Sequence, residues 1–268
     1  MLSPVTGFLA EAGFTHSLTP ARNCTFGCTY CYVPTLRIYA GLKPVDWQHW
    51  GQFTTFKPDV AKAVSKELRP EQRIYCSPLV DPYQPAEEQE RVMPGVLEAI
   101  TLRPPTAFVI QTRGPLILRD LDLLRRMPKL RVSFSVTTDR EDIRALYEPH
   151  CAPIAERWRT IRALREAGIE TYATLAPLLP CNPEALIAAA LEATDQALIA
   201  DPLHTRAGKS RGATTREAAL HISRKQGWEE WHDPAFQSCI VKRMAEAAHR
   251  AGRQFGIGPP AFGWLALD

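Results

Sequence analysis

The chain is 268 residues long, 45% of its residues are hydrophobic, and its formal net charge at pH 7 is +3. This length and composition fit one large domain with a sizeable core, and no apolar run reaches the roughly 18 residues that a membrane-spanning helix needs. The N-terminal residues lack a basic region followed by an apolar run, so we expect no secretory signal. The small net charge does not indicate nucleic-acid binding by itself.

Six short runs of β-branched, aromatic and other apolar residues, each bounded by turn residues, predict strands. They cover residues 17–20, 73–76, 107–111, 130–136, 170–175 and 197–200. Helical patterns lie between and after them, over residues 116–127, 155–167, 184–194 and 236–251. Gly168 is suited to end the second of these helices, and Asn182 with Pro183 predicts the N-cap and first position of the third.

The alternation of strands and helices predicts an α/β fold in which right-handed crossovers make the strands parallel. Six such units form a partial (β/α)6 barrel. In folds of this kind, ligand-binding residues lie at the carboxyl ends of the strands and in the loops that follow them. We therefore expect the functional residues to come directly after the predicted strands.

Cys24, Cys28 and Cys31 follow the first predicted strand with the spacing CxxxCxxC. Three thiolates can hold three corners of a cubane [4Fe-4S] cluster, which usually takes four, so one iron is left without a protein ligand. An open iron can bind the amino and carboxylate groups of a small molecule such as S-adenosylmethionine. The spacing therefore predicts a [4Fe-4S] cluster at which a reaction takes place.

Other uses of the cysteines are weighed against this prediction. A structural zinc site normally draws on two short ligand pairs, and the sequence has no second pair. A disulfide framework is disfavoured because seven cysteines are an odd number and the chain is far larger than domains that need such staples. We expect Cys151, Cys181 and Cys239 to be buried and chemically inert.

The cysteine spacing, with the aromatic Tyr30 directly before the last cysteine, resembles the radical S-adenosylmethionine superfamily. The resemblance implies that Cys24, Cys28 and Cys31 bind the cluster and that Tyr30 lies near the adenine of S-adenosylmethionine. It implies that an electron from the cluster cleaves S-adenosylmethionine to a 5'-deoxyadenosyl radical, with a reductant such as flavodoxin or ferredoxin. The thiolate-ligated cluster favours a cytoplasmic location, and no membrane partner is expected.

Motifs at the ends of the later strands resemble the spore-photoproduct-lyase-like branch of this superfamily. They are residues 77–85, which include Asp-Pro-Tyr-Gln-Pro, then Thr112 and Arg113, the segment 135–138, and Ala176 with Pro177. The resemblance spans about residues 17–200. It implies a partial (β/α)6 TIM-like radical S-adenosylmethionine barrel over residues 1–200, with a C-terminal loop and helical cap over residues 201–268 in the same domain.

The resemblance also assigns roles at matched positions. Asp81 is expected to hold the ribose or amino end of S-adenosylmethionine. Arg113 stands where the branch often has lysine, and it is expected to bind the carboxylate of S-adenosylmethionine. Ser135 is expected to bind the carboxylate or ribose, and Ala176 to offer backbone atoms to the adenine. Each of these residues also has a simpler alternative role. Asp81 can start a turn, and Arg113 can be a solvated loop residue. Ser135 can face a neighbouring helix.

Cys76 lies at the end of the second predicted strand and has two interpretations. The photoproduct lyase uses a cysteine in this neighbourhood to return a hydrogen atom to the product radical, which makes Cys76 the candidate catalytic residue. A packed strand residue is the alternative.

A basic stretch follows the sixth predicted strand and is suited either to phosphate groups of a polyanionic substrate or to a solvated loop. Its members are His204, Arg206, Lys209, Arg211 and Arg216. Residues 207–210 resemble the end of a phosphate-binding P-loop but lack its first glycine, so no nucleoside triphosphate site is predicted.

Three functions follow from these observations. The first is a radical enzyme that acts on a nucleic acid or a nucleoside-like substrate, which the lyase-like resemblance favours. The second is a radical enzyme that acts on a peptide or a small metabolite. The third is a non-catalytic metal-binding interaction module.

Overall fold

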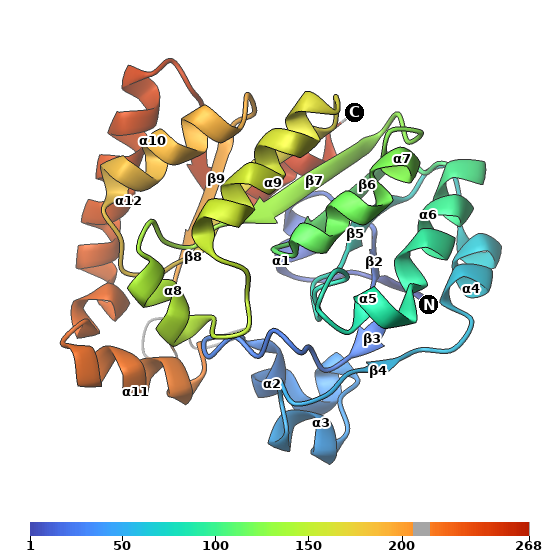
Figure 1. Ribbon diagram of the computed structural model, residues 1–268, viewed down its shortest axis with the longest axis horizontal. Coiled ribbons are helices and arrows are strands. Elements are labelled where there is room, and N and C mark those ends of the chain that lie inside the picture. The colour runs from blue at the N-terminus through green and yellow to red at the C-terminus, as the bar shows by residue number, and fades with distance from the viewer. Residues whose placement is uncertain (206–214, 268) are drawn as a thin grey trace.

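The computed structural model describes residues 1–205 and 215–267 of the chain. Within these residues, an eight-stranded sheet has the strand order β1-β2-β5-β6-β7-β8-β9-β10, and a separate ribbon pairs β3 with β4 (Figure 1). The strands are β1 (Leu2–Pro4), β2 (His16–Leu18), β3 (Ala21–Arg22), β4 (Thr55–Phe56), β5 (Arg73–Cys76), β6 (Ala107–Thr112), β7 (Leu130–Ser135), β8 (Glu170–Leu178), β9 (Leu198–Pro202) and β10 (Phe255–Ile257).

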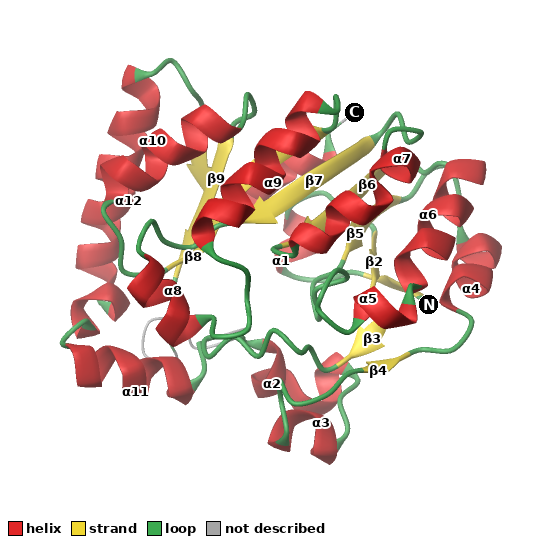
Figure 2. Cartoon of the chain, in the orientation of Figure 1, coloured by secondary structure: helices red, strands yellow, loops and turns green. Residues whose placement is uncertain are grey.

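The longer helices α6, α9, α10 and α12 cover one face of the sheet (Figure 2), and the short helices α1 and α13 lie on the other face. The α-helices are α1 (Phe8–Glu11), α2 (Val33–Leu36), α3 (Pro44–Gln48), α4 (Val60–Glu67), α5 (Glu87–Glu90), α6 (Val92–Leu102), α7 (Leu121–Leu124), α8 (Glu141–Tyr147), α9 (Ile154–Glu166), α10 (Pro183–Ala193), α11 (Glu217–Gln226), α12 (Pro234–Arg250) and α13 (Gly258–Phe262). Short 3-10 helices are η1 (Arg37–Ala40), η2 (Pro115–Asp120), η3 (Glu229–His232) and η4 (Gly263–Ala266).

The six predicted strands are β2, β5, β6, β7, β8 and β9, and each pairs in parallel with the next. This arrangement confirms the predicted partial barrel. The first strand ends at Leu18, two residues before the predicted end, and the fifth continues to Leu178, three residues beyond it. A seventh parallel strand, β10, pairs with β9, and β1 pairs antiparallel with β2 at the other edge. Neither edge strand was predicted.

The boundaries of α9 and α10 lie within one residue of those predicted. The Asn182 side chain accepts a hydrogen bond from the backbone N–H of Ala185 at 3.0 Å and starts α10, and Gly168, with φ of 79°, follows α9. The predicted helix over residues 116–127 is instead divided into η2 and α7. At the junction, the buried Asp120 carboxylate accepts hydrogen bonds from Arg119 and from the Tyr83 hydroxyl.

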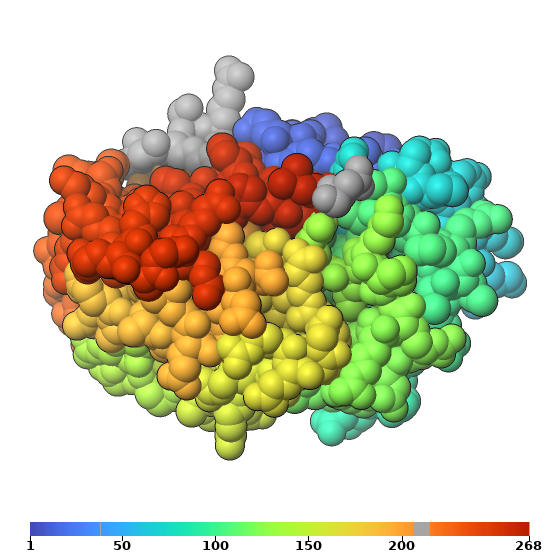
Figure 3. Space-filling view, turned by 90° about the horizontal axis from the view of Figure 1, so that it is seen from above, coloured from blue at the N-terminus to red at the C-terminus, as the bar shows by residue number. Residues whose placement is uncertain are grey.

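The two faces of the sheet differ. Alternate strand residues such as Ile74, Phe108 and Val132 pack against the outer helices, where α9, α10 and α12 lie side by side (Figure 3). On the inner face, the residues between them pack against the N- and C-terminal segments, as Tyr75 does against Phe14 with ring centroids 5.0 Å apart. The chain ends therefore cover part of the inner face with apolar side chains.

The residues after β9 add a strand to the sheet and a helix to its outer face. Helix α12 packs on α10 and contacts β10, which extends the sheet. Helix α11, which was not predicted, contributes Ala219 and Ile222 to the apolar cluster around the cysteine loop. The helix predicted over residues 236–251 is α12. No helix in the described part of the chain is long and apolar enough to span a bilayer.

Candidate functional site

The cysteine loop lies between β3 and α2, at the carboxyl edge of the sheet (Figure 1). Cys24 and Cys28 are buried, Cys31 is partly exposed, and all three are free thiols. Burial raises the pKa of Cys24, with a smaller effect from the nearby Asp81 charge, and raises the pKa of Cys31 to about 12. A bound metal deprotonates a coordinating thiol outright, so such thiols release protons when they bind one.

Asn23 bonds the start of this loop to α3 and to the turn that follows it. It is fully buried and has a left-handed backbone, with φ of 61°. Its amide nitrogen donates to the carbonyl oxygens of Asp46 and His49, both at 3.1 Å, and its amide oxygen accepts from the N–H groups of Cys24 at 2.8 Å and Gly51 at 2.9 Å. One side chain thus makes four bonds that fix the position of the first cysteine.

Two glycines let the same segments approach closely. A Cβ atom on Gly51 would lie 2.8 Å from the Cα of Gly27, and one on Gly27 would lie 3.2 Å from the Cα of Gly51. Both glycines have positive φ, 94° and 56°. The contact therefore requires glycine at Gly51 for space as well as for conformation.

The Asp-Pro-Tyr-Gln-Pro motif organises the loops around the cysteines. The Asp81 carboxylate accepts hydrogen bonds from the hydroxyl of Thr112 at 2.6 Å and from the N–H groups of Arg113 at 2.8 Å and Tyr83 at 2.9 Å. Burial raises the pKa of Asp81, and these bonds oppose that rise. The Gln84 amide oxygen accepts from the N–H of Thr25 at 2.7 Å, inside the cysteine loop.

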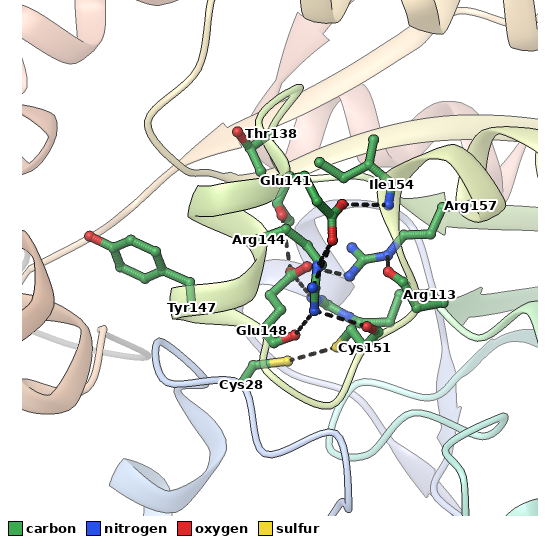
Figure 4. A network of polar contacts seen from close by, with 12 residues as sticks. Cys28, Arg113, Thr138, Glu141, Arg144, Tyr147, Glu148, Cys151, Ile154 and Arg157 are labelled. Carbon is green, nitrogen blue, oxygen red and sulfur yellow. Dashed lines mark hydrogen bonds and ion pairs between the residues drawn. The ribbon is translucent and has the colours of Figure 1, made fainter.

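Tyr30 and Arg113 meet at a buried carboxylate, that of Glu148. Arg113 is ion-paired with Glu148 at 2.5 Å, and both Arg113 and Glu148 are hydrogen-bonded to the Tyr30 hydroxyl. Arg157, whose side chain has no exposed surface, is ion-paired with the other Glu148 oxygen at 2.5 Å (Figure 4). The Thr137 hydroxyl donates to Glu148 at 3.0 Å. Arg113 is thus ion-paired and mostly enclosed, with 15% of its side chain exposed, which does not fit a solvated loop residue.

Opposing effects set the protonation of Glu148. Burial alone would raise its pKa, but the charges of Arg157 and Arg113 and the bond from Tyr30 lower the pKa to about 2. The opposite charge of Asp81 lies near Cys24, and beside the rest of the cysteine loop Arg113, Arg157 and Glu148 together carry a net positive charge. This charge is suited to an anionic group bound above it.

Ser135 lies deeper, on the inner face of the sheet. Its hydroxyl accepts a hydrogen bond from the Gln111 amide at 2.7 Å, and Gln111 in turn accepts from Tyr75 and Ser133, each at 2.6 Å. Ser135 therefore does not face a helix. Ala176 is partly buried and packs against the apolar cluster of the same face, so the inner face carries both predicted residues.

Cys76 is on the opposite face. Its side chain has no exposed surface and belongs to the cluster between sheet and helices, with Ile74 and Tyr83, whereas the preceding Tyr75 points to the inner face. Burial raises the pKa of Cys76. Strand alternation thus separates Cys76 from the inner-face residues.

The remaining cysteines differ from one another. Cys151 is buried as predicted, but its Sγ lies 3.8 Å from that of Cys28, a proximity that the sequence did not indicate. This contact is the main cause that lowers the pKa of Cys28. The prediction of burial is wrong for Cys239, which is exposed on α12, and Cys181 is only partly buried.

Two members of the basic stretch lie in the described residues. His204 contacts the Asp201 carboxylate at 3.1 Å, and Arg216 donates to the carbonyl oxygen of Cys28 at 3.5 Å. Arg216 therefore meets the cysteine loop itself. Arg206, Lys209 and Arg211, like the P-loop-like residues 207–210, lie outside the described residues.

The thiols suit a cluster better than a single ion. Among the residues that the structure describes, no three His, Cys, Asp or Glu side chains converge on a position for one metal ion. Tetrahedral zinc needs its ligands on one ion, whereas a cubane cluster distributes its ligands over separate irons. The three free thiols of the cysteine loop match in number the protein ligands of a [4Fe-4S] cluster that keeps one open iron.

Residues 18–192 match the family model of the radical SAM superfamily. The matched region is well over half of the chain, and it contains the cysteine loop and the whole of strands β5, β6, β7 and β8. The chain belongs to the radical SAM superfamily.

Curated relatives share part of this region. A protein of Methanocaldococcus jannaschii is 27% identical over 160 residues, which are 59% of this chain and 58% of the relative. A protein of Mycobacterium tuberculosis is 28% identical over 181 residues, which are 64% of this chain and 52% of the relative. The chain thus spans little more than half the length of these relatives.

Solved structures share the fold. A spore photoproduct lyase variant has a TM-score of 0.66 and 15% identity, and the match covers 96% of this chain and 78% of the lyase. The protein anSMEcpe, solved with bound AdoMet and a peptide, has a TM-score of 0.51 and 15% identity, with 90% of this chain and 63% of that chain covered. Neighbours that bind different substrates therefore have this architecture.

Several site residues were not recognised from the sequence. They are Asn23, Gln84, Glu148, Cys151 and Arg157. Gln84 lies in a motif that was noted. Glu148 and Cys151 come after α8 and not in the loop that directly follows the fourth strand, so the rule of strand ends does not select them. For Asn23 the only signal is its place directly before the first cysteine.

Proposed function

We propose that this chain is an enzyme that holds a [4Fe-4S] cluster on Cys24, Cys28 and Cys31 and reductively cleaves S-adenosylmethionine. The observation that carries the proposal is the set of three free thiols at the carboxyl edge of a radical SAM barrel, on a loop whose Tyr30 contacts the mostly enclosed Arg113. When bound, such a cluster supplies the electron for the cleavage and an open iron for the amino acid end of S-adenosylmethionine.

The residues around the thiols have separate roles in this proposal. Arg113 binds the carboxylate of S-adenosylmethionine, and Glu148 holds the guanidinium in place. Tyr30, hydrogen-bonded to both, lies beside the adenine, while Ser135 and Ala176 contact the cofactor from the inner face. Asp81, whose oxygens are occupied by backbone and side-chain donors, positions Arg113 rather than contacting the ribose.

Cys76 is assigned the packing role of its two interpretations, because it lies between sheet and helices. A Cys76→Ala variant that turns over S-adenosylmethionine but yields an altered or unrepaired product would reassign it as the hydrogen donor.

Apolar side chains exclude water from the cysteine loop. Phe26, Trp50 and Leu179 belong to the buried cluster that surrounds it. A dry surrounding strengthens the electrostatic contacts inside and protects a radical from side reactions.

Anaerobic reconstitution tests the proposal. The reconstituted protein should contain an iron–sulfur cluster with an electron paramagnetic resonance signal after reduction, and should release 5'-deoxyadenosine and methionine from S-adenosylmethionine. Replacing Cys24, Cys28 or Cys31 by Ala should abolish both properties, whereas the exposed Cys239→Ala should retain them. Zinc in the anaerobically purified protein, without cleavage, would favour the metal-binding module.

For the substrate we infer a nucleic acid or nucleoside-like group. The support is the lyase-like motif series and the similarity to a spore photoproduct lyase that was solved with a dinucleoside spore photoproduct. Binding to DNA and RNA should be measured by fluorescence anisotropy at several salt concentrations. Each phosphate contact removed by Arg206→Ala, Lys209→Ala or Arg211→Ala should reduce the log–log salt slope by roughly 0.7–0.9. Absent binding in the presence of cofactor would favour a peptide or small metabolite.

A further inference from the structure

Cys151 is a fourth cysteine at the cysteine loop. Its Sγ is 3.8 Å from the Sγ of Cys28, and both side chains are buried (Figure 4). The separation is far longer than the roughly 2.05 Å of a disulfide bond. Cys151 lies outside the three-cysteine motif, and the proposed function gives it no role.

The position of Cys151 is fixed by the turn that follows α8. Arg144 donates from one nitrogen to the carbonyl oxygens of Glu148 at 3.0 Å and Cys151 at 3.1 Å. Glu141 is ion-paired with Arg144 at 2.7 Å and accepts from the N–H of Ile154 at 3.1 Å. These contacts hold both ends of the turn.

The same turn is bonded to the cysteine loop. The N–H of Thr29 donates to the carbonyl oxygen of Tyr147 at 2.9 Å, and the Thr29 hydroxyl contacts the same oxygen at 3.2 Å. Thr29 directly follows Cys28, and Tyr147 lies four residues before Cys151. The two sulfur atoms are therefore held together by backbone contacts on both sides, and their approach does not depend on the side chains alone.

We propose that the Cys151 thiol donates a hydrogen bond to the Cys28 sulfur and thereby raises the reduction potential of the bound cluster. The inference rests on the proposed function, since it needs Cys28 as a cluster ligand. A cysteine sulfur bound to iron carries no proton, so only Cys151 can be the donor in this contact. Hydrogen bonds to the sulfurs of an iron–sulfur cluster are among the factors that set its reduction potential.

Charge in the same layer acts in the same direction. Three thiolates make the bound cluster anionic, and reduction adds an electron. The positive charges of the fully buried Arg157 and of Arg113 exceed the one negative charge of Glu148, and these three residues lie around the turn that carries Cys151. The Cys151 hydrogen bond and this positive layer therefore both favour the reduced cluster.

A redox titration of the cluster-loaded 268-residue chain tests the role of Cys151. Wild type, Cys151→Ala, Cys151→Ser and the matched control Cys181→Ala are reconstituted anaerobically, assayed for iron, and titrated while the reduced cluster is followed by electron paramagnetic resonance. We expect Cys151→Ala to keep the wild-type iron content and to shift the reduction equilibrium roughly tenfold toward the oxidised cluster, about 59 mV for one electron. Cys151→Ser, which retains a donor, should recover most of the shift, and Cys181→Ala should match wild type.

Two results would overturn the inference while the proposed function stands. One is an unchanged potential in Cys151→Ala. The other is loss of iron in Cys151→Ala, which would make Cys151 a ligand. A wild-type protein that binds zinc or no cluster instead overturns the proposed function, and with it this inference.

Discussion

Arg113 and Glu148 join the end of the third parallel strand, β6, to the end of α8 through an ion pair of 2.5 Å in which the carboxylate has no exposed surface. The Tyr30 hydroxyl, from the cysteine loop, is bonded to both partners. Three loops that are far apart in the sequence are thus fixed to one carboxylate. Stability and cofactor binding are therefore expected to depend on the same residue.

Replacing Glu148 by Gln should destabilise the protein by about 3–5 kcal/mol, because the buried Arg157 and Arg113 lose their counter-charge. The measurement is the free energy of unfolding in urea. Glu184→Gln is the matched control, since it removes the partner of Arg243 in an exposed pair, and such pairs contribute little. Equal effects of the two substitutions would contradict the role given to Glu148.

The same carboxylate should make stability depend on pH in the acid range. Folding lowers the pKa of Glu148 from its ordinary 4.5 to about 2. A carboxyl whose pKa falls on folding stabilises the folded state above the unfolded value, and the contribution is lost as the pH drops toward the folded value. Between pH 4.5 and 2, wild type should lose about 3 kcal/mol that Glu148→Gln does not lose. The measurement is the free energy of unfolding in urea of the two iron-free proteins as a function of pH. If wild type and Glu148→Gln lose the same free energy between pH 4.5 and 2, Glu148 is not responsible.

Asn23 offers a way to separate backbone conformation from side-chain bonding. Asn23→Gly keeps the left-handed conformation and removes the four hydrogen bonds, while Asn23→Ala also adds backbone strain. Both variants should bind less iron after anaerobic reconstitution, and Asn23→Ala should have the lower melting temperature. Full iron binding by Asn23→Gly would mean that the cysteine loop does not depend on this side chain.

The contact between Gly27 and Gly51 can be tested against a glycine in open space. Gly51→Ala places a Cβ 2.8 Å from the Gly27 Cα, whereas Gly41, with φ of 68°, has no atom within 4 Å of such a Cβ. Both substitutions strain the backbone by about 1 kcal/mol, but only Gly51→Ala should displace the cysteine loop and reduce the iron content. If Gly41→Ala reduces iron to the same extent, backbone strain alone is the cause.

The sequence predicted those parts of the molecule that local patterns define. Strand β5 has its predicted bounds, and the cysteine loop follows the first parallel strand as expected. The edge strands β1 and β10 were missed because each has only three residues, too few for a periodic pattern. Their place in the sheet depends on pairing with residues distant in the sequence.

In the site, too, residues in local motifs were predicted and residues brought in by distant packing were not. Tyr30 and Arg113 were identified from motifs, but Glu148, Arg157 and Cys151 join them only through the packing of α8 and α9. The side to which Cys76 points was also open, since it depends on the strand phase. Motifs identify residues that bind a cofactor more readily than the buried residues that hold them in place.

Cofactor affinity gives the most direct test of how Asp81 acts. Arg113→Ala removes the cation proposed for the S-adenosylmethionine carboxylate, and Asp81→Ala removes the acceptor for the Arg113 N–H and the Thr112 hydroxyl. Each should weaken binding roughly 10- to 150-fold, the loss of about 1.5–3 kcal/mol, while the cluster remains. Anaerobic isothermal titration calorimetry measures this, with the exposed Asp142→Ala as control. Because Asp81 acts through Arg113, the double variant should bind no more weakly than Arg113→Ala alone. Additive losses would instead indicate a direct contact between Asp81 and the cofactor, and unchanged affinity in both single variants would remove the two residues from the site.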